Sequence, residues 1–403
     1  MRLPFTLVAL VSAACAPPPQ LVAVEPTQGP TAQEVALVVT GHDLVPGLTL
    51  ELVGQAFRFA LRVDEVAADQ VRAVIPAGVD AARYDLVVRN PDGADDRLAA
   101  AYQAVDAVLT VVVLDVGQGA SLLAVGSDGS SLLVDGGKEG RAASVLRPAL
   151  ARYSQGQLDT VVVTHFDVDH MGGIAEWMEG PDGLAGTDDD PALPGGLWDN
   201  GGAADCTTDI CRRYRVAAAG RAHTIVPGQT FALGAASARC VIVGGHIEGG
   251  PQLSPADDNA SSVGLLFEMA GKRVLVSGDL PGGGLGSQDF ETPLAQVLGP
   301  IDVWHLNHHG SATATAQSAL DLHAPRLALI PVDTDNAYCH PAQEVVDRLQ
   351  VRALPVYLTG AGTVTPSTAC PQTTQLGPQM KVVGEIRLEI DAAGALTVNG
   401  APL

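Results

Sequence analysis

Apolar positions in the first hundred residues alternate in the way that short β-strands require. The runs VALVVTG (residues 35–41), LTLELVG (48–54) and YDLVV (84–88) are rich in Val, Leu and Tyr and are separated by Gly, Pro and Asp turns. Strands of this length and spacing are typical of a small β-sandwich. The pattern therefore predicts an all-β domain over residues 21–106.

From residue 107 onward the pattern changes to strands that alternate with helical segments. The apolar runs VLTVVV (108–113), SLLV (131–134) and LDTVVVTH (158–165) read as strands, and AASVLRPALARY (142–153) has the spacing of a helix. Such alternation indicates layered α/β architecture. We therefore expect one α/β domain over residues 107–403.

Polar side chains with metal-binding chemistry follow the strand that ends at residue 165. The segment THFDVDHMGG places His165, Asp167, Asp169 and His170 on a tight turn, and the two glycines after it let the backbone wrap closely. Imidazole and carboxylate together favour zinc or manganese over calcium. The alternative is that these side chains only decorate a turn.

Two later strands end in further candidate ligands. KRVLVSGD (272–279) delivers Asp279, and IDVWHLNHHGS (301–311) delivers His308 and His309. Three strands are thus each followed by candidate metal ligands. We therefore expect the strands to share one edge of a sheet, where these ligands would form a metal centre.

The charge of the chain limits its partners. It has 45 acidic and 23 basic residues, a net charge of -22, and no run of Lys and Arg that could follow a phosphate backbone. We therefore expect no basic DNA-binding surface.

The N-terminal segment MRLPFTLVALVSAAC (1–15) reads as a secretion signal, followed by a linker over residues 16–20. Its end resembles the lipobox of bacterial lipoproteins, which implies membrane anchoring through a lipidated Cys15; cleavage without lipid is the alternative. No later segment is apolar for the eighteen or more residues that a transmembrane helix needs. The expected location is the bacterial cell envelope, or the periplasm or extracellular space.

The remaining cysteines are expected to include disulfides, as in other exported proteins. Cys206 and Cys211 are the first candidate pair and Cys339 with Cys370 the second, whereas Cys240 lies in an apolar strand.

Residues 21–106 resemble the IPT/TIG immunoglobulin-like family. The resemblance is carried by Pro26 to Gly29, Val39 to Gly41, Ile75 with Pro76, and Val88 to Gly93. It implies a spacer or binding module, and we assign it no chemistry.

Residues 110–365 resemble the metallo-β-lactamase superfamily, and within it the hydrolase domain of ComEC-type competence proteins. The motifs that match, in order, are LDVGQGAS, LLVDGG, THFDVDHMGG, LWDNG, DNASSV, VLVSGDL, NHHGS and NAYCHP. The resemblance implies an αββα sandwich that holds two divalent ions, Zn or Mn.

The resemblance also implies roles for individual residues. His165 and Asp167 would bind one metal, Asp169 and His170 the other, and Asp279 would bridge them. A histidine of the next motif would complete the second site; His309 is preferred, with His308 as the alternative. Asn259 would be a weak ligand or a substrate contact.

Catalytic and supporting roles follow from the chemistry of such a two-metal site and from the positions of the residues along the chain. Asp169 would orient the attacking hydroxide, and His340 would contact a phosphoryl oxygen or protonate a leaving group, unless it is simply a turn residue before Pro341. Asp135 and Asp115 would support the metal-bearing loop by accepting hydrogen bonds from it, without binding the metal themselves.

The expected function is a secreted or membrane-anchored, competence-related dinuclear hydrolase. The resemblance implies cleavage of phosphodiester bonds, as a nuclease or phosphodiesterase, in a phosphate-ester or nucleic-acid substrate. The alternatives are an acyl hydrolase acting on a lactam or lactone, and a catalytically silent surface binding lipoprotein.

Overall fold

The protein is represented by a computed structural model that describes residues 17–31, 34–55, 57–106, 108–202 and 207–403. It divides into two compact units, Met1–Asp106 and Ala107–Leu403. The expected signal segment with Cys15, and also Cys206, lie outside the described residues.

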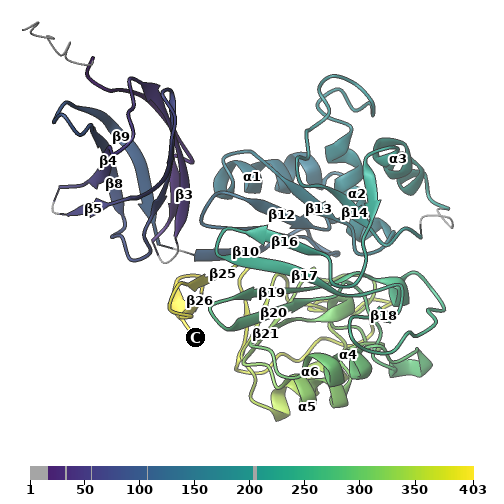
Figure 1. Cartoon of the computed structure of the whole chain (residues 1–403). Helices are drawn as coiled ribbons and strands as arrows, with labels where there is room; N and C mark the ends of the chain where they lie inside the picture. The colour runs from purple at the N-terminus through teal and green to yellow at the C-terminus, as the bar shows by residue number, and fades with distance from the viewer. Residues whose placement is uncertain (1–16, 32–33, 56, 107, 203–206) are drawn as a thin grey trace, which may run out of the picture. The chain divides into compact units, whose positions relative to one another are not determined.

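The N-terminal unit is all-β, as predicted (Figure 1). Side chains that alternate along its strands, such as Leu37 with Val39 and Leu50 with Leu52, are buried in one core. The described strands form two sheets, of which one has the order β1 (Gln20–Glu25), β3 (Val35–His42), β7 (Gln70–Ile75) and β6 (Arg62–Val66). The other has the order β2 (Gln28–Pro30), β9 (Asp95–Val105), β8 (Ala82–Arg89), β4 (Thr49–Val53) and β5 (Arg58–Ala60).

The second unit contains two large sheets. In the described residues the first sheet has the order β15 (Ala222–Thr224), β14 (Gly196–Asp199), β13 (Thr160–Val162), β12 (Ser131–Val134), β11 (Leu122–Val125), β10 (Val108–Val113), β25 (Ile386–Asp391), β26 (Leu396–Val398) and β27 (Ala401–Pro402). The second has the order β16 (Thr230–Leu233), β17 (Ala236–Val243), β19 (Gly264–Met269), β20 (Lys272–Val276), β21 (Val303–His305), β22 (Leu327–Ile330), β23 (Val356–Leu358) and β24 (Met380–Val382), and β18 (His246–Ile247) pairs with β17.

Helices cover the outer face of each sheet (Figure 1). On the first sheet lie η1 (Ala142–Leu146), α1 (Arg147–Tyr153), α2 (Val168–Met178) and α3 (Asp209–Ala218). On the second lie α4 (Glu291–Leu298), α5 (Gln317–His323) and α6 (Gln343–Val351). An apolar core lies between each sheet and its helices. Another, which includes Val111 and Val276, fills the space between the two sheets. The layers are helix, sheet, sheet and helix, which confirms the predicted αββα sandwich.

Both faces of each sheet are therefore buried, and this accounts for the unbroken apolar runs of the sequence. All four residues of β11 and of β12 are buried, as expected for strands covered on both faces.

The expectation that the three ligand-bearing strands share one sheet edge is wrong. β13 lies in the first sheet between β12 and β14, whereas β20 and β21 are neighbours in the second sheet. A hydrogen bond from the N–H of Val263 to the carbonyl of Thr164 (2.9 Å) links the two sheets beside the site. The candidate ligands therefore reach the site from the ends of both sheets.

Among the described residues, no helix combines the length and the apolar character needed to cross a bilayer.

The second predicted disulfide is present. Cys339 and Cys370 are joined, and Cys240 is a buried free thiol on β17, as expected. Cys211 is also disulfide-bonded, but its expected partner Cys206 lies outside the described residues.

Removing the Cys339–Cys370 bridge should destabilise the second unit. The bridge joins residues with a sequence separation of 31. A disulfide that closes a loop of this size typically stabilises a fold by about 2–4 kcal/mol, because it restricts the unfolded chain. Denaturant unfolding of the variant carrying Cys339→Ser and Cys370→Ser, compared with the unaltered protein without reductant, measures this loss. An unchanged free energy of unfolding would contradict the prediction.

Candidate metal centre

The segment after β13 forms the floor of the site. His165 is fully buried, and Asp167 holds the N-cap position of α2 but makes no capping hydrogen bond with its side chain. A capping Asp ordinarily accepts a bond from the first helical turn. Here the carboxylate instead lies with Oδ2 3.6 Å from His165 Nε2. Asp169 and the buried His170 follow in the first turn of α2.

Glycines let α2 approach the loop that follows β12. A Cβ atom on Gly173 would lie 2.1 Å from the carbonyl oxygen of Gly136, and one on Gly136 would lie 2.8 Å from the nitrogen of Ile174. Real side chains do not tolerate these separations. The glycines of the two GG motifs therefore bring Asp135 against His170.

Asp135 orients two neighbouring residues. Its Oδ1 accepts a bond from the N–H of Thr164 (2.8 Å), and its Oδ2 accepts bonds from the Thr164 hydroxyl (2.7 Å) and from His170 Nδ1 (2.8 Å). Because Nδ1 of His170 donates to Asp135, Nε2 is left as the ligand nitrogen. Asp135 thus contacts the loop that the sequence analysis expected it to support.

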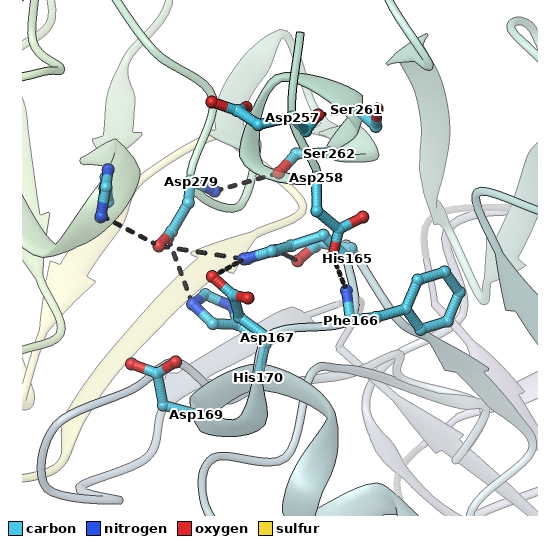
Figure 2. Close-up of polar contacts among 12 residues, drawn as sticks. His165, Phe166, Asp167, Asp169, His170, Asp257, Asp258, Ser261, Ser262 and Asp279 are labelled. Atoms are coloured by element: carbon cyan, nitrogen blue, oxygen red, sulfur yellow. Dashed lines mark hydrogen bonds and ion pairs between the residues drawn. The ribbon is translucent and has the colours of Figure 1, made fainter. Parts of the chain in front are cut away.

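Asp279 lies at the centre of the cluster (Figure 2). Its carboxylate oxygens lie 3.2 Å from His170 Nε2 and 3.9 Å from His165 Nε2, and 3.6 Å from Nε2 of both His308 and His309. The N–H of Asp279 donates to Ser262 Oγ (3.2 Å). One carboxylate thus faces imidazoles that arrive from both sheets, as a bridging ligand would.

The His308–His309 pair lies on the short helix η5 (Asn307–Gly310), and both residues have left-handed φ values of 50° and 54°. His309 Nδ1 donates to the carbonyl of Pro331 (2.9 Å), so its Nε2 faces the site, 3.2 Å from His170 Nε2 and 3.7 Å from Asp169 Oδ2. His308 places Nδ1 3.0 Å from the Thr313 hydroxyl. This geometry supports His309 over His308 as the second-site ligand.

The donor set fits divalent cations. In the described part of the chain, His165, His170 and Asp279 form one group of candidate ligands, and Asp169, His170 and His309 form another, each with its ligand atoms within 4.8 Å of one another. Among the same residues, the buried atoms His165 Nε2 and Asp279 Oδ1 have no hydrogen-bond partner. Buried polar atoms without partners are costly unless something binds them. Imidazole and carboxylate are the ligands that zinc and manganese accept.

The charges of the cluster are strongly coupled. Burial lowers the pKa of His170, but the charges of Asp279 and Asp135 outweigh it and raise this pKa well above its ordinary value. Burial raises the pKa of Asp279, but the charges of His170, His309 and His308 hold it well below its usual range. The protein interior thus favours positive charge beside Asp279, which is the preference of a cation site.

His340 also lies beside the cluster. It is buried, its ring stacks on that of His309 at a centroid distance of 6.1 Å, and its Nδ1 has no partner among the described residues. Burial, and then the neighbouring His309 and His308, lower the pKa of His340 to about 3. A neutral imidazole there suits a hydrogen bond to substrate rather than donation of a proton.

Two predicted residues are not brought into the cluster by any contact described. Asp115 is exposed and accepts a bond from the N–H of Gly117 in its own turn (3.3 Å). Asn259 lies on the short helix η3 (Asn259–Ser261), where its carbonyl accepts a bond from Ser262 N–H.

Asp258, to which the sequence analysis gave no role although it opens the DNASSV motif, lies close to the site instead. Its Oδ2 accepts a 2.6 Å bond from the N–H of Phe166, within the segment that carries His165 (Figure 2). The signals for it in the sequence were the acidic doublet at residues 257–258 and its place at the start of the DNASSV motif.

Two cavities flank the cluster. One, of about 640 Å³, includes Asp167 and Asp169 in its wall, and the other, of about 410 Å³, includes Ser311 and His340. Tyr338 lines both cavities. A substrate with a group on each side of its reacting atom would therefore find room for both.

Substituting Asp135→Asn should weaken metal binding without unfolding the protein. Both carboxylate oxygens of Asp135 accept hydrogen bonds, from the N–H of Thr164 and from His170. In asparagine one of these oxygens is replaced by an NH2 group, which cannot accept, so one of these hydrogen bonds is lost. Loss of such a supporting partner typically reduces metal affinity by about 10–100-fold. Competition titration with a chromophoric chelator measures the affinity, and circular dichroism checks the fold. Equal affinity in both proteins would contradict the supporting role.

Comparison with known proteins adds to this geometry. A family model described as "Metallo-beta-lactamase superfamily" matches residues 114–332, which is more than half of the chain. Recombination protein 2 of Haemophilus influenzae is 26% identical over 248 residues, which cover 59% of this chain and 26% of that protein.

Two further relatives match, and one of them is named a competence protein. Competence protein ComA of Neisseria gonorrhoeae is 28% identical over 251 residues, covering 62% of this chain and 30% of its own length. ComE operon protein 3 of Bacillus subtilis is 32% identical over 107 residues, covering 26% of this chain and 13% of its own length. The matches thus span less than a third of each of these relatives.

Proposed function

Because the chain belongs to the metallo-beta-lactamase superfamily, we propose that it is a hydrolase that holds two divalent cations, Zn or Mn, and cleaves phosphodiester bonds. The observation that carries the proposal is the position of Asp279. Its carboxylate lies within 4 Å of imidazole nitrogens from both sheets, and its buried Oδ1 has no hydrogen-bond partner among the described residues.

The ligands divide between two positions. His165 and Asp167, together with Asp279, would hold one cation, and Asp169, His170 and His309, again with Asp279, would hold the other. Half-exposed Asp167 lies next to His165, so the first position is the more open of the two. When bound, such a pair of cations polarises a phosphoryl oxygen and lowers the pKa of water at the site.

The residues of the chain would arrange the hydrolysis itself. A bond forms from the water oxygen to phosphorus, the bond from phosphorus to the leaving alkoxy oxygen breaks, and the proton lost by water ends on the leaving oxygen. Asp169, whose side chain is only 17% exposed and lies 3.7 Å from His309 Nε2, would orient the attacking oxygen. The unpartnered Nδ1 of His340 would hold a phosphoryl oxygen.

The two cavities can accommodate the two substituents of a phosphodiester. A phosphodiester carries one substituent on each side of phosphorus, and a cavity adjoins the cluster on the side of Asp169 and another on the side of His340. The names of the relatives, which refer to recombination and competence, agree with a phosphodiester substrate.

We also propose that the chain works outside the cytoplasm, as an exported protein of the cell envelope whose Cys15 carries lipid. The disulfide Cys339–Cys370 supports an oxidising compartment. We propose that the N-terminal β-sandwich is an IPT/TIG-like spacer or binding module.

Parallel assays test the proposed reaction. Purified protein is loaded with Zn or Mn and given bis-p-nitrophenyl phosphate or a chromogenic β-lactam. We expect turnover of the diester, its loss after chelation and dialysis, and its return when the metal is restored. Turnover of the lactam alone would replace the phosphodiesterase proposal with an acyl hydrolase, and no metal-dependent turnover of either would remove the catalytic proposal.

A further inference from the structure

The cavity next to Asp167 and Asp169 has a strongly acidic wall. It has a volume of about 640 Å³, and four of its lining residues are aspartates, whereas none of its described lining residues is Lys or Arg. The four aspartates are Asp167, Asp169, Asp257 and Asp258. Figure 2 shows them around His165 and Asp279.

This cavity adjoins the candidate metal centre. Asp167 and Asp169 belong both to the cavity wall and to the ligand cluster, where they lie 3.6 Å from His165 Nε2 and 3.7 Å from His309 Nε2. His165 Nε2 is buried and has no hydrogen-bond partner among the described residues. This nitrogen is the atom that would bind the first cation, so the acidic cavity lies next to the proposed reaction centre.

Two of the four carboxylates remain available for a substrate. Cations held as proposed would neutralise Asp167 and Asp169, but Asp257 and Asp258 are not among the proposed metal ligands. Each is fixed by a backbone donor: Asp257 Oδ1 accepts from the N–H of Ala260 (2.9 Å), and Asp258 Oδ2 accepts from the N–H of Phe166 (2.6 Å). A pair of carboxyl groups held in place by the backbone therefore lines the cavity.

Aromatic rings complete the wall. Phe166 and Tyr338 line the same cavity, and the ring of Phe166 packs against that of Tyr214 at a centroid distance of 5.6 Å. Aromatic faces and carboxylates together recognise ammonium groups. The same wall repels a second phosphate, so it discriminates against a polynucleotide strand as well as attracting a cation.

We propose that the substrate is a phosphodiester of an ammonium-bearing alcohol, whose cationic group lies in this acidic cavity while the scissile phosphate lies at the metal centre. The inference rests on the proposed phosphodiesterase function and narrows its substrate class. It places Asp257 and Asp258 in substrate recognition, away from the reacting atoms.

Three substrates with the same p-nitrophenol leaving group test the inference in the metal-loaded protein. They are p-nitrophenyl phosphorylcholine, its uncharged isostere p-nitrophenyl 3,3-dimethylbutyl phosphate, and thymidine 3′-phosphate 5′-(p-nitrophenyl phosphate), which carries an extra phosphate. We expect kcat/KM for the ammonium ester to exceed that of the isostere by roughly tenfold, and the nucleotide to be the slowest. Equal rates for the first two, or a fastest nucleotide, would overturn the inference but leave the phosphodiesterase proposal standing. Failure of all three to react would remove the proposed function itself.

Variants and a binding measurement separate recognition from turnover. In the variant with Asp257→Asn and Asp258→Asn, each amide retains an oxygen that can accept the backbone bond, and the ammonium-to-isostere ratio should fall at least about fivefold. The exposed Asp188 is not among the residues that line the cavity, so Asp188→Asn should keep the ratio. Calorimetry should show that the unaltered protein binds phosphorylcholine more tightly than 3,3-dimethylbutyl phosphate, and that this difference in affinity is lost in the double variant. A ratio unchanged in the double variant would overturn the inference.

The ammonium alcohol could belong to a free diester or to a lipid headgroup. Choline release from glycerophosphocholine, or phosphorylcholine release from phosphatidylcholine vesicles, would each support the proposal and would identify the source.

Discussion

Replacing Asp279 with Asn should reduce phosphodiester turnover by at least roughly a hundredfold and lower the metal content below the two ions expected for the unaltered protein. The carboxylate lies between the imidazoles of His165, His170 and His309 and supplies charge to both proposed positions. An amide has the same shape but no charge, so it weakens both. Elemental analysis of the purified variant, together with initial rates on bis-p-nitrophenyl phosphate, measures the two effects.

A matched control separates this effect from a general loss of acidic charge. Asp188→Asn makes the same chemical change at an exposed position outside the cluster, and should leave metal content and rate unchanged. Turnover at the original rate in Asp279→Asn would remove Asp279 from the mechanism.

Replacing His170 with Gln should have a comparable or larger effect, with a rate loss on the order of a thousandfold. His170 belongs to both groups of candidate ligands, and its ring is fixed by Asp135 on one side while it faces Asp279 on the other. Glutamine is of similar size but cannot present an imidazole nitrogen. We expect less than about one bound ion per chain, measured by elemental analysis after removal of loosely bound metal.

The control for this variant is His246→Gln, at an exposed histidine on β18. It should keep the metal content and the rate. Because His170 is fully buried, circular dichroism and the unfolding midpoint must show that the His170 variant is folded. A folded His170→Gln protein with its full metal content would show that this ring is not a ligand.

The sequence alone predicted the parts of the site that are local along the chain. His165 to His170 could be recognised because four candidate ligands, two His and two Asp, lie within six residues at the end of an apolar run. Asp279 and His309 could be recognised because each follows an apolar strand at a glycine-containing turn. The αββα layers followed from the alternation of strands and helices and from the resemblance of the motifs.

Features that depend on packing between distant segments were not predictable. The assignment of β13 to one sheet and of β20 and β21 to the other depends on strand pairing, to which apolar runs of similar length give no guide. Asp258 faces the site because its carboxylate accepts the N–H of Phe166, a contact between residues 92 positions apart in the chain. Asp115 ends a strand beside glycines just as Asp135 does, yet its described side-chain contact is local.

The predicted helix over residues 142–153 shows the limit at a finer scale. The structure begins it as the π-helical turn η1 and continues it as α1 from Arg147, with Pro148 in the first turn of α1. Proline is tolerated in a first helical turn, where its missing N–H is not needed. The apolar spacing identified the helix but could not show the change in its hydrogen-bond pattern.

The central claim is that segments from two sheets converge on a pair of cations. Anomalous diffraction from crystals of the zinc- or manganese-loaded protein tests it most directly. Two peaks should each lie at coordination distance, about 2.0–2.2 Å, from an oxygen of Asp279. One peak should also be coordinated by His165 and the other by His309. Peaks away from Asp279, or none after metal loading, would contradict the account.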